Sequence, residues 1–364
     1  MTGCTVSQAV RGVRTGHYIL NGQYTAAVAS QIPGTGIPGV DSLLRGGFKS
    51  FLDQISKNWR DNKIPTEKTY VKYSENYKSR AIVDFENGKI QVETIIDQQT
   101  KKALTKAIVQ TLLTPEDPSS IDLYSAEEPR LGERPFLLDL VQNQSQKPIQ
   151  NQWQAQDYAE YLIQKHYRQY SLKGKKRFAV NFQMVPDFKT RLGKHYNYWV
   201  SQYAKRYQLE PSLIYGIIET ESAFNPFAVS SAPAYGLMQI VPETAGRDVY
   251  RFLKQRDGIP NKTQLFSPAT NIEYGTTYLH LLFNRYLNNI KDPQTQQYCV
   301  ISAYNTGSGN VLKSFHYDRN SAIRIINRLS SDQVYRHLLQ KLSTSEARNY
   351  LPKVIANKRK YEIF

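Results

Sequence analysis

Two glutamates, Glu219 and Glu221, stand two positions apart in the stretch IIETESAFNPFAVSSAPAYGLMQ, residues 217–239. A carboxyl group among apolar side chains is hard to ionise, so its pKa rises. It then holds the proton that a general acid must donate near neutral pH. The stretch therefore carries a candidate acid, and the position of each glutamate on its element decides which one it is.

The residues before this stretch predict a helix from Pro211, because proline suits the first helical turn. Positions i, i+3, i+4 and i+7 of one face are Ile214, Ile217, Ile218 and Glu221. Glu221 thus extends the apolar stripe. Glu219 lies roughly 200° around the helix from it, on the face expected to be more exposed to solvent. The alternative for Glu221 is a buried acid that pairs with one of the many basic residues.

Four ordered motifs resemble the soluble-lytic-transglycosylase domain, a lysozyme-like fold that cleaves bacterial peptidoglycan. The first motif comprises Glu221-Ser222, Asn225-Pro226, Ser230, Gly236-Leu237-Met238-Gln239 and Thr244-Ala245. The others are LFSPATNIEYGTTYL, SAYNTGSGNV with Ala303-Tyr304-Asn305, and SEARNYLPKV with Glu346 and Tyr350. The resemblance covers most of residues 205–360. Pro233, Ser267 and Thr306 depart from the family pattern, and none of these departures removes a catalytic group.

The resemblance implies that Glu221 is the catalytic acid and base. It implies a substrate-binding role for Ser230, Met238, Gln239, Tyr304, Asn305 and Tyr350. Glu346 is expected to be structural, and neither a metal nor a cofactor is expected. Tyr304, just before the helix end predicted at Gly307, also fits a core tyrosine, and Tyr350 also fits ordinary helix packing.

The implied reaction needs only one carboxyl group, whereas ordinary glycosidases use two. Glu221 protonates the β-1,4 bond between N-acetylmuramic acid and N-acetylglucosamine, and the muramoyl C6 hydroxyl then closes onto C1. The product is a 1,6-anhydromuramoyl end. The alternatives are a hydrolytic lysozyme of the same fold and a non-catalytic peptidoglycan-binding protein.

The composition describes a globular chain with a strong basic excess. Its 364 residues suffice for two domains, and 47 Lys and Arg against 31 Asp and Glu give a net charge of +16. Such a charge suits anionic partners such as peptidoglycan carboxylates or a phospholipid surface. A nucleic-acid partner is not expected, because no nucleic-acid-binding motif is recognised. No apolar run approaches the roughly 18 residues of a membrane-spanning helix.

The two cysteines make no disulfide framework. Cys299 stands in the apolar run YCVISAY and is predicted to be a buried, inert thiol. Cys4 ends the sequence MTGC, which is typical of a bacterial lipoprotein processing site. It is therefore a candidate lipidation residue.

Residues 48–186 are predicted to form a small α+β domain. Ala81, Val83 and Phe85 alternate with polar residues, Asn87-Gly88 predicts a type I′ hairpin turn, and Ile90 and Val92 continue the alternation. A helix is expected to end at Pro115, followed by a long irregular connection over 115–150. The run KKRFAVNFQMV predicts another strand of the same sheet. No catalytic cluster stands out in this domain.

Residues 1–47 are predicted to be an N-terminal anchor and linker. Gly34, Gly36 and Gly39 fit the spacing of a dinucleotide fingerprint, but no buried strand precedes them, so a plain loop is expected.

The segment from NWRDNK to QVET resembles the N-terminal domain of the membrane-bound lytic murein transglycosylase C family. That family consists of lipoproteins. The resemblance implies acylation of Cys4 and a place on the periplasmic face of the envelope, at the outer membrane of a Gram-negative bacterium.

After Pro186 the alternation disappears and apolar residues recur at helical spacing. Residues 187–364 are predicted to form an all-α, lysozyme-like catalytic domain of seven to nine short helices. The expected architecture is an α+β N-terminal domain followed by an all-α catalytic domain.

Overall fold

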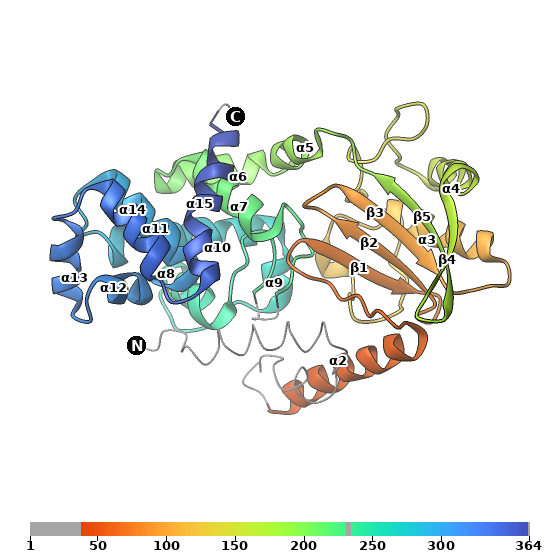
Figure 1. The fold of residues 1–364 in the computed structure, drawn as a ribbon, viewed down its shortest axis with the longest axis horizontal. Helices are drawn as coiled ribbons and strands as arrows, with labels where there is room; N and C mark the ends of the chain where they lie inside the picture. The colour runs from red at the N-terminus through yellow and green to blue at the C-terminus, as the bar shows by residue number, and fades with distance from the viewer. Residues whose placement is uncertain (1–37, 231–233, 363–364) are drawn as a thin grey trace.

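The structure is a computed structural model that describes residues 38–230 and 234–362, with side chains described from Gly47 onward. Helix α2 (Pro38–Asn58) is the first described element and lies below the sheet in Figure 1. It begins at a proline, as many helices do. The expectation of a plain loop at the glycine motif is therefore wrong at Gly39, which lies in this helix. Cys4, Gly34 and Gly36 lie outside the described residues.

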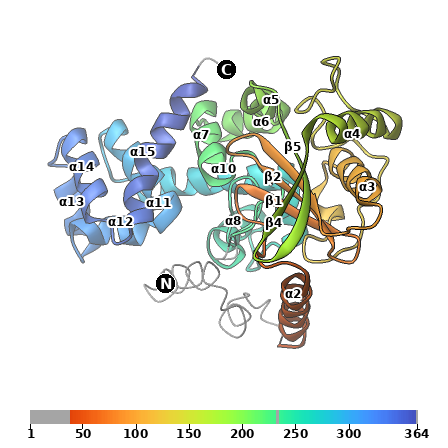
Figure 2. The ribbon, with the colours of Figure 1, turned by 45° about the vertical axis from the view of Figure 1, so that its right-hand side comes forward.

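Five antiparallel strands form one sheet in the order β1-β2-β3-β5-β4. The strands are β1 (Thr69–Ser74), β2 (Ser79–Asp84), β3 (Lys89–Thr94), β4 (Tyr167–Leu172) and β5 (Lys175–Gln183). All strand pairs among residues 38–230 and 234–362 are antiparallel, so this part of the chain contains no βαβ unit of the kind that a dinucleotide fingerprint requires. The sheet and the helical part lie side by side in both ribbon views (Figures 1 and 2).

The hairpin around Asn87 and Gly88 exists, but its predicted turn type is wrong. Residues 85–88 separate β2 from β3, and Gly88 alone of these four has a positive φ, 66°. A type I′ turn would need positive φ at two central residues. The Asp84 carboxylate instead accepts hydrogen bonds from the N–H groups of Glu86 and Asn87, at 2.9 and 3.1 Å, which stabilises a longer turn.

One face of the sheet packs on helices α3 (Thr100–Leu112) and α4 (Gln152–His166). The alternating residues predicted for this face are all buried: Ala81, Val83, Phe85, Ile90, Val92, Phe178, Val180 and Phe182. The connection from 113 to 151 contains only the 3₁₀ helix η2 (Pro118–Ser120), as the composition of this region predicted. The α+β prediction for this half is confirmed.

The other face of the sheet contacts α2 through a second, smaller apolar cluster that includes Phe51, Ile55 and Trp59. The guanidinium carbons of Arg80 and Arg177 lie 4.0 and 4.2 Å from the centre of the Trp59 ring. Both stacking arginines are buried, and such cation–π contacts strengthen when water is excluded.

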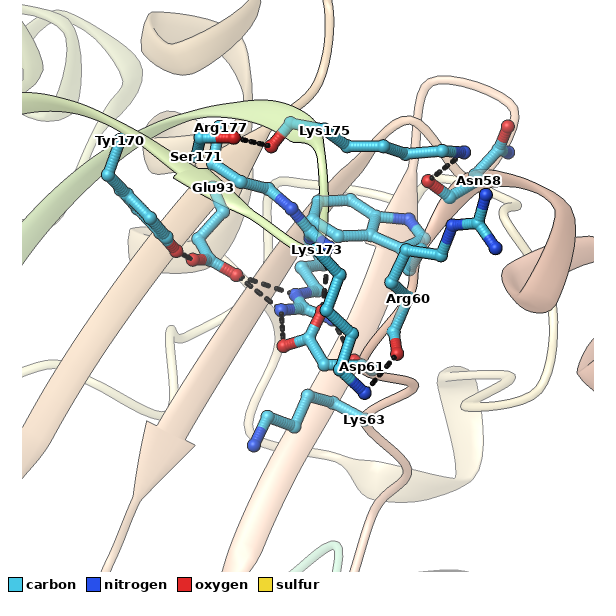
Figure 3. A network of polar contacts seen from close by, with 12 residues as sticks. Asn58, Arg60, Asp61, Lys63, Glu93, Tyr170, Ser171, Lys173, Lys175 and Arg177 are labelled. Carbon is cyan, nitrogen blue, oxygen red and sulfur yellow. Dashed lines mark hydrogen bonds and ion pairs between the residues drawn. The ribbon is translucent and has the colours of Figure 1, made fainter. Parts of the chain in front are cut away.

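Two acids neutralise the buried arginines, as Figure 3 shows. Arg80 pairs with Glu93 at 2.6 Å and with Asp61 at 2.9 Å, while Arg177 pairs with Asp61 at 2.7 Å. The Tyr170 hydroxyl, from edge strand β4, donates a further hydrogen bond to Glu93. The network thereby joins the chain after α2 to strands β2, β3, β4 and β5.

Lysines of the β4–β5 hairpin cap the last carbonyls of α2 (Figure 3). Lys175 donates to the carbonyl oxygens of Lys57 and Asn58, at 2.8 and 2.9 Å, and Lys173 donates to that of Arg60 at 3.3 Å. A helix leaves its last carbonyls unpaired and carries partial negative charge at that end, so ammonium groups stabilise it there.

The C-terminal half is helical, which confirms the prediction of an all-α part. Its helices are α5 (Phe188–His195), α6 (Asn197–Tyr207), α7 (Pro211–Ser222), α8 (Arg247–Lys254), α9 (Lys262–Phe266), α10 (Pro268–Leu281), α11 (Pro293–Thr306), α12 (Ser308–Phe315), α13 (Arg319–Ile326), α14 (Ser331–Lys341) and α15 (Ser345–Lys360), with π-helical turns η3 (Pro242–Gly246) and η4 (Leu282–Tyr286).

These are eleven α-helices within the described ranges, so the expected seven to nine was too few. Several are a few turns long and follow one another after single capping residues, which sequence periodicity does not resolve. Cys299 is fully buried on α11, and burial raises the pKa of its thiol to about 12, as expected for an inert thiol. Within residues 38–230 and 234–362, no helix combines the length and apolarity needed to cross a membrane.

The two halves share one continuous apolar core. The ring of Phe227, from the loop after α7, lies 4.8 Å from that of Tyr70 on β1 and 5.1 Å from that of Phe136. Lys262 on α9 places its ammonium 5.3 Å from the ring of Tyr124 in the N-terminal half. These contacts fix the sheet relative to the end of α7.

We expect Arg80→Met to lower the free energy of unfolding by about 3–5 kcal/mol, because it leaves the buried Glu93 carboxylate without its partner. Lys176→Met is the matched control, since it removes an ion pair with Asp97 in which both side chains are 64% exposed. That control should change stability by about 0–1 kcal/mol. Urea denaturation followed by fluorescence measures both, and equal losses for the two variants would contradict the structural role of the network.

Candidate active site

Glu221 lies in the last turn of α7, and the three isoleucines of the predicted stripe on that helix are fully buried. The helix ends at Ser222, before the Asn225-Pro226 pair. Ala223 and Phe224 follow with φ of 50° and 64°, a left-handed conformation that non-glycine residues seldom adopt. Both side chains are buried, so tertiary packing holds this sharp exit from the helix.

The Glu221 carboxyl group is half-buried, and the Tyr350 hydroxyl donates a hydrogen bond of 2.6 Å to its Oε1. Burial raises the pKa of Glu221 to about 8, and repulsion from the carboxylates of Glu346 and Glu67 adds to the rise. The Tyr350 hydrogen bond and the charge of Lys68 oppose it. The net effect is a carboxyl group that keeps its proton at neutral pH, which is the state a general acid needs.

Glu219 has the opposite character, and its expected exposure to solvent is wrong. Its side chain is 3% exposed, and its carboxylate accepts hydrogen bonds from Lys189 (3.1 Å), Lys360 (2.8 Å) and Tyr361 (2.8 Å). Burial pushes the pKa of Glu219 upward, but Lys360, Tyr361 and Lys189 outweigh that effect and lower it.

The reason for this burial is that α15 packs along α7. Its C-terminal residues Lys360 and Tyr361 cover the face that carries Glu219, while Tyr350, on the same helix, reaches Glu221. The two carboxylates thus lie on different faces of α7, as the helical period predicts, but residues of α15 and its C-terminal end pack against both faces. One is protonated and the other is ionised and paired.

The structure brings the backbone at Leu237 and Met238 to the end of α7. Ser222 Oγ donates to the Leu237 carbonyl at 2.8 Å, and Tyr304 donates to the Met238 carbonyl at 2.9 Å. The Met238 side chain is fully buried against Gly275, where an added Cβ would lie 2.3 Å from its sulfur. Met238 therefore faces the core with its side chain, and only its carbonyl joins the site.

Gln239 adopts a left-handed φ of 48°, and its Nε2 donates to the Gly236 carbonyl at 2.9 Å. Its Oε1 is buried and has no hydrogen-bond partner in the structure. A buried acceptor without a partner is unfavourable, and a ligand hydroxyl or amide N–H can satisfy it.

Tyr304 and Asn305 end α11 beside this group. Burial and the charge of Glu221 raise the pKa of Tyr304 well above its usual range, so its hydroxyl stays protonated. Asn305 donates to Glu346 Oε1 at 3.0 Å, which joins the end of α11 to the start of α15.

Ser230 accepts a hydrogen bond from the Ala234 N–H at 3.3 Å. Residues 231–233, including Pro233, lie outside the described part of the chain.

Sequence reasoning missed Glu67 and Lys68, which come from the N-terminal half and interact electrostatically with Glu221. Asn225 donates to the Glu67 carbonyl at 3.1 Å across 158 residues of sequence. No local pattern marks this contact, because only the packing of β1 on the loop after α7 creates it.

A cavity of about 60 Å³ lies at the seam between the halves and is lined by Phe85, Glu116, Arg134 and His195 among others. It has room for a few water molecules but not for a sugar, and neither Glu221 nor any predicted substrate residue lines it. Among residues 38–230 and 234–362, no group of three or more His, Cys, Asp or Glu side chains could hold a metal ion.

Two family models match this chain in succession. The membrane-bound lytic murein transglycosylase C, N-terminal domain, matches residues 41–194, and the transglycosylase SLT domain matches residues 199–327. A five-stranded antiparallel sheet with helices, followed by a helical SLT domain carrying a protonated glutamate, defines an enzyme of the lytic transglycosylase class.

Curated relatives match over nearly the whole length. Membrane-bound lytic murein transglycosylase C of Haemophilus ducreyi is 43% identical over 88% of this chain and 86% of its own. That of Mannheimia succiniciproducens is 41% identical over 94% of this chain and 93% of its own. The chain belongs to the membrane-bound lytic murein transglycosylase C family. Among solved structures, lytic transglycosylase Slt of Pseudomonas aeruginosa covers 48% of this chain and 25% of its own at 26% identity, with a TM-score of 0.38.

We expect Glu219→Gln to destabilise the protein by about 1–3 kcal/mol, because it removes the charge that Lys189 and Lys360 contact. The folded pKa of Glu219 is depressed, so its stabilisation is present above its unfolded pKa and is lost as pH falls through the folded value. The difference in stability between wild type and variant should therefore be full at pH 7 and shrink toward pH 3. A difference independent of pH, measured by urea denaturation at each pH, would contradict this account.

Proposed function

We propose that this lytic murein transglycosylase cleaves the β-1,4 bond between N-acetylmuramic acid and N-acetylglucosamine without water, with Glu221 as acid and then as base. The observation that carries the proposal is the carboxyl group of Glu221, which burial keeps protonated and Tyr350 orients. The family to which the chain belongs supports the choice of peptidoglycan as substrate.

The reaction proceeds in two proton transfers. Glu221 gives its proton to the glycosidic oxygen, the bond from C1 of the muramoyl residue to that oxygen breaks, and the glycosaminyl hydroxyl leaves. The N-acetyl carbonyl of the muramoyl residue stabilises the cation that develops at C1. The Glu221 carboxylate then takes the proton of the C6 hydroxyl as that oxygen bonds to C1. The 1,6-anhydromuramoyl end forms and Glu221 is protonated again.

The substrate groove is proposed to be lined by Ser230, Met238, Gln239, Tyr304, Asn305 and Tyr350 around Glu221. The Gln239 Oε1, which has no partner, supports a hydrogen bond to a sugar hydroxyl or acetamido N–H. Met238 contributes through its backbone, since its side chain is buried. No cofactor takes part in this scheme.

We propose the division into an anchor and linker (1–47), an α+β domain (48–186) and a catalytic domain (187–364). The protein is proposed to sit on the periplasmic face of the envelope as an outer-membrane lipoprotein acylated at Cys4. The names of the relatives, which describe membrane-bound enzymes, support a membrane location. The basic charge of +16 suits both an anionic membrane surface and the carboxylates of peptidoglycan stem peptides.

We expect Glu221→Gln to retain glycan binding and to lose about 10²–10⁴-fold in turnover of purified sacculi, because the amide cannot donate a proton. Glu219→Gln is the matched control on the same helix and should retain turnover at temperatures where it is folded. Mass spectrometry of the products separates the alternatives. Anhydro ends support transglycosylation, reducing ends indicate a hydrolytic lysozyme, and no release of glycan by wild type indicates a protein that only binds peptidoglycan.

The pH dependence offers a second test of the acid. Because the protonated form of Glu221 is the active one, the rate of wild type should fall about tenfold per pH unit above pH 8, where the group loses its proton. Initial rates on soluble glycan strands from pH 5 to 10 measure this. A rate that falls instead through pH 4–5 would mean that Glu221 has an ordinary pKa and would contradict the assignment.

A further inference from the structure

The segment Thr66-Glu67-Lys68, just before β1, lies against the end of the catalytic helix α7. Asn225, fully buried four residues after Glu221, donates from its Nδ2 to the carbonyl oxygens of Glu67 (3.1 Å) and Thr66 (3.4 Å). The N–H of Thr66 donates to the Thr69 carbonyl at 2.9 Å and closes a turn around the segment. These bonds place Glu67 at one defined site beside the helix end.

Packing keeps the segment in register with the catalytic half. The next inward-facing residue, Tyr70, contacts Phe227, and both rings are buried in the core that the two halves share. Phe227 N–H in turn donates to Asn225 Oδ1 at 3.0 Å. The same asparagine therefore bonds both to its own loop and to the N-terminal half, so Glu67 and Glu221 belong to one rigid unit.

Charged and titratable groups from three elements face the Glu221 carboxyl group. They are Glu67 and Lys68 before β1, Tyr304 on α11, and Glu346 and Tyr350 on α15. Lys68 forms an ion pair of 2.5 Å with Glu86, so the Glu86 carboxylate already balances much of its positive charge. The N-terminal segment therefore brings the negative charge of Glu67, which raises the pKa of Glu221, and the partly balanced charge of Lys68, which lowers it.

Two carboxyl groups that interact do not both ionise readily, and the environment decides which one keeps the proton. Glu67 is half-buried, has Lys68 next to it, and its carboxylate accepts a hydrogen bond from its own backbone N–H. Burial and repulsion from Glu346 raise the pKa of Glu67, its own backbone N–H and Lys68 lower it, and burial raises the pKa of Glu221 to about 8. Because Glu67 has these two groups that favour its charged form, we assign the negative charge to Glu67 and the proton to Glu221.

We propose that Glu67 is a positioning residue for the catalytic proton: its negative charge, carried on a segment whose backbone Asn225 holds beside α7, helps burial and Glu346 to keep Glu221 protonated so that it can act as the acid. The N-terminal half then takes part in catalysis through a single electrostatic contact. This inference rests on the proposed role of Glu221 as general acid, and it deepens that role by naming one charge from the N-terminal half that adds to the effect of burial on its pKa. Glu67 forms no bond with the sugar in this scheme.

The test is the pH dependence of turnover on soluble glycan strands at constant ionic strength. We expect Glu67→Gln to move the alkaline limb of the profile to lower pH by about 0.5–1 unit, because one repelling charge is lost. At pH 8 this lowers the rate about two- to fivefold relative to wild type, and the loss shrinks toward pH 6. Glu67→Lys, which reverses the charge, should move the limb about twice as far, and Glu67→Asp should restore most of the wild-type position.

The matched control is Glu133→Gln, which removes the same charge from an exposed site of the same domain. It should leave the alkaline limb in place, and thermal unfolding should show that all the variants are folded. A merely structural role for Glu67 would lower the rate equally at every pH and would not scale with charge. An alkaline limb at the same pH in wild type, Glu67→Gln and Glu67→Lys would therefore overturn the proposal.

The outcomes also separate this inference from the proposed function. Reducing ends among the wild-type products would overturn the transglycosylation mechanism but would leave the shift of the alkaline limb measurable, because hydrolysis needs the same protonated acid. An active Glu221→Gln variant would overturn both, since Glu67 acts through Glu221. Anhydro products together with an unmoved limb in the Glu67 variants would overturn the inference alone.

Discussion

The crossing of α15 over α7 is the contact on which the active site depends. Gly216 allows it, since an added Cβ at this position would lie 2.9 Å from the backbone nitrogen of Lys358. Close approach at that point lets α15 reach two carboxylates of α7 with different partners: Tyr350 for Glu221 and Lys360 with Tyr361 for Glu219. Glu221 accepts a hydrogen bond from a neutral hydroxyl and stays protonated, whereas Glu219 contacts cations and is ionised. One helix pair thus produces an acid and an ion pair from two identical side chains.

Much of this arrangement could be predicted from local sequence, and the rest could not. The phase of Ile214, Ile217, Ile218 and Glu221 marked the glutamate whose pKa burial raises, because helical periodicity is a property of neighbouring residues. The burial of Glu219 depends on residues about 140 positions later, and the charge of Glu67 reaches Glu221 only through the packing of β1. Periodicity places a residue on a face of its helix, but only the tertiary fold determines what covers that face.

The difference between local sequence patterns and tertiary contacts also explains the wrong predictions in the N-terminal half. Asn87-Gly88 correctly predicted a hairpin, but the Asp84 carboxylate stabilises a longer turn than the type I′ turn expected. Helix α2 was missed at its start because Gly and Pro residues suggested a loop, although proline is favourable in a first helical turn. Its last carbonyls are then bound by Lys175, and Asp61 just after it pairs with Arg177, both from β5, which no window of neighbouring residues contains.

Through the contacts of Asn225, the pKa of Glu221 depends on parts of the chain that are far apart in sequence. The acid strength of Glu221 arises from three segments, residues 66–68, 211–222 and 345–360, that are separate in sequence and meet only in the native fold. In a partly folded chain, Glu221 is an ordinary carboxylate in water and has no proton to give at neutral pH. Under the proposed role of Glu221, the enzyme therefore gains its glycan-cleaving chemistry only when folding is complete, and local unfolding at Asn225 removes part of that chemistry.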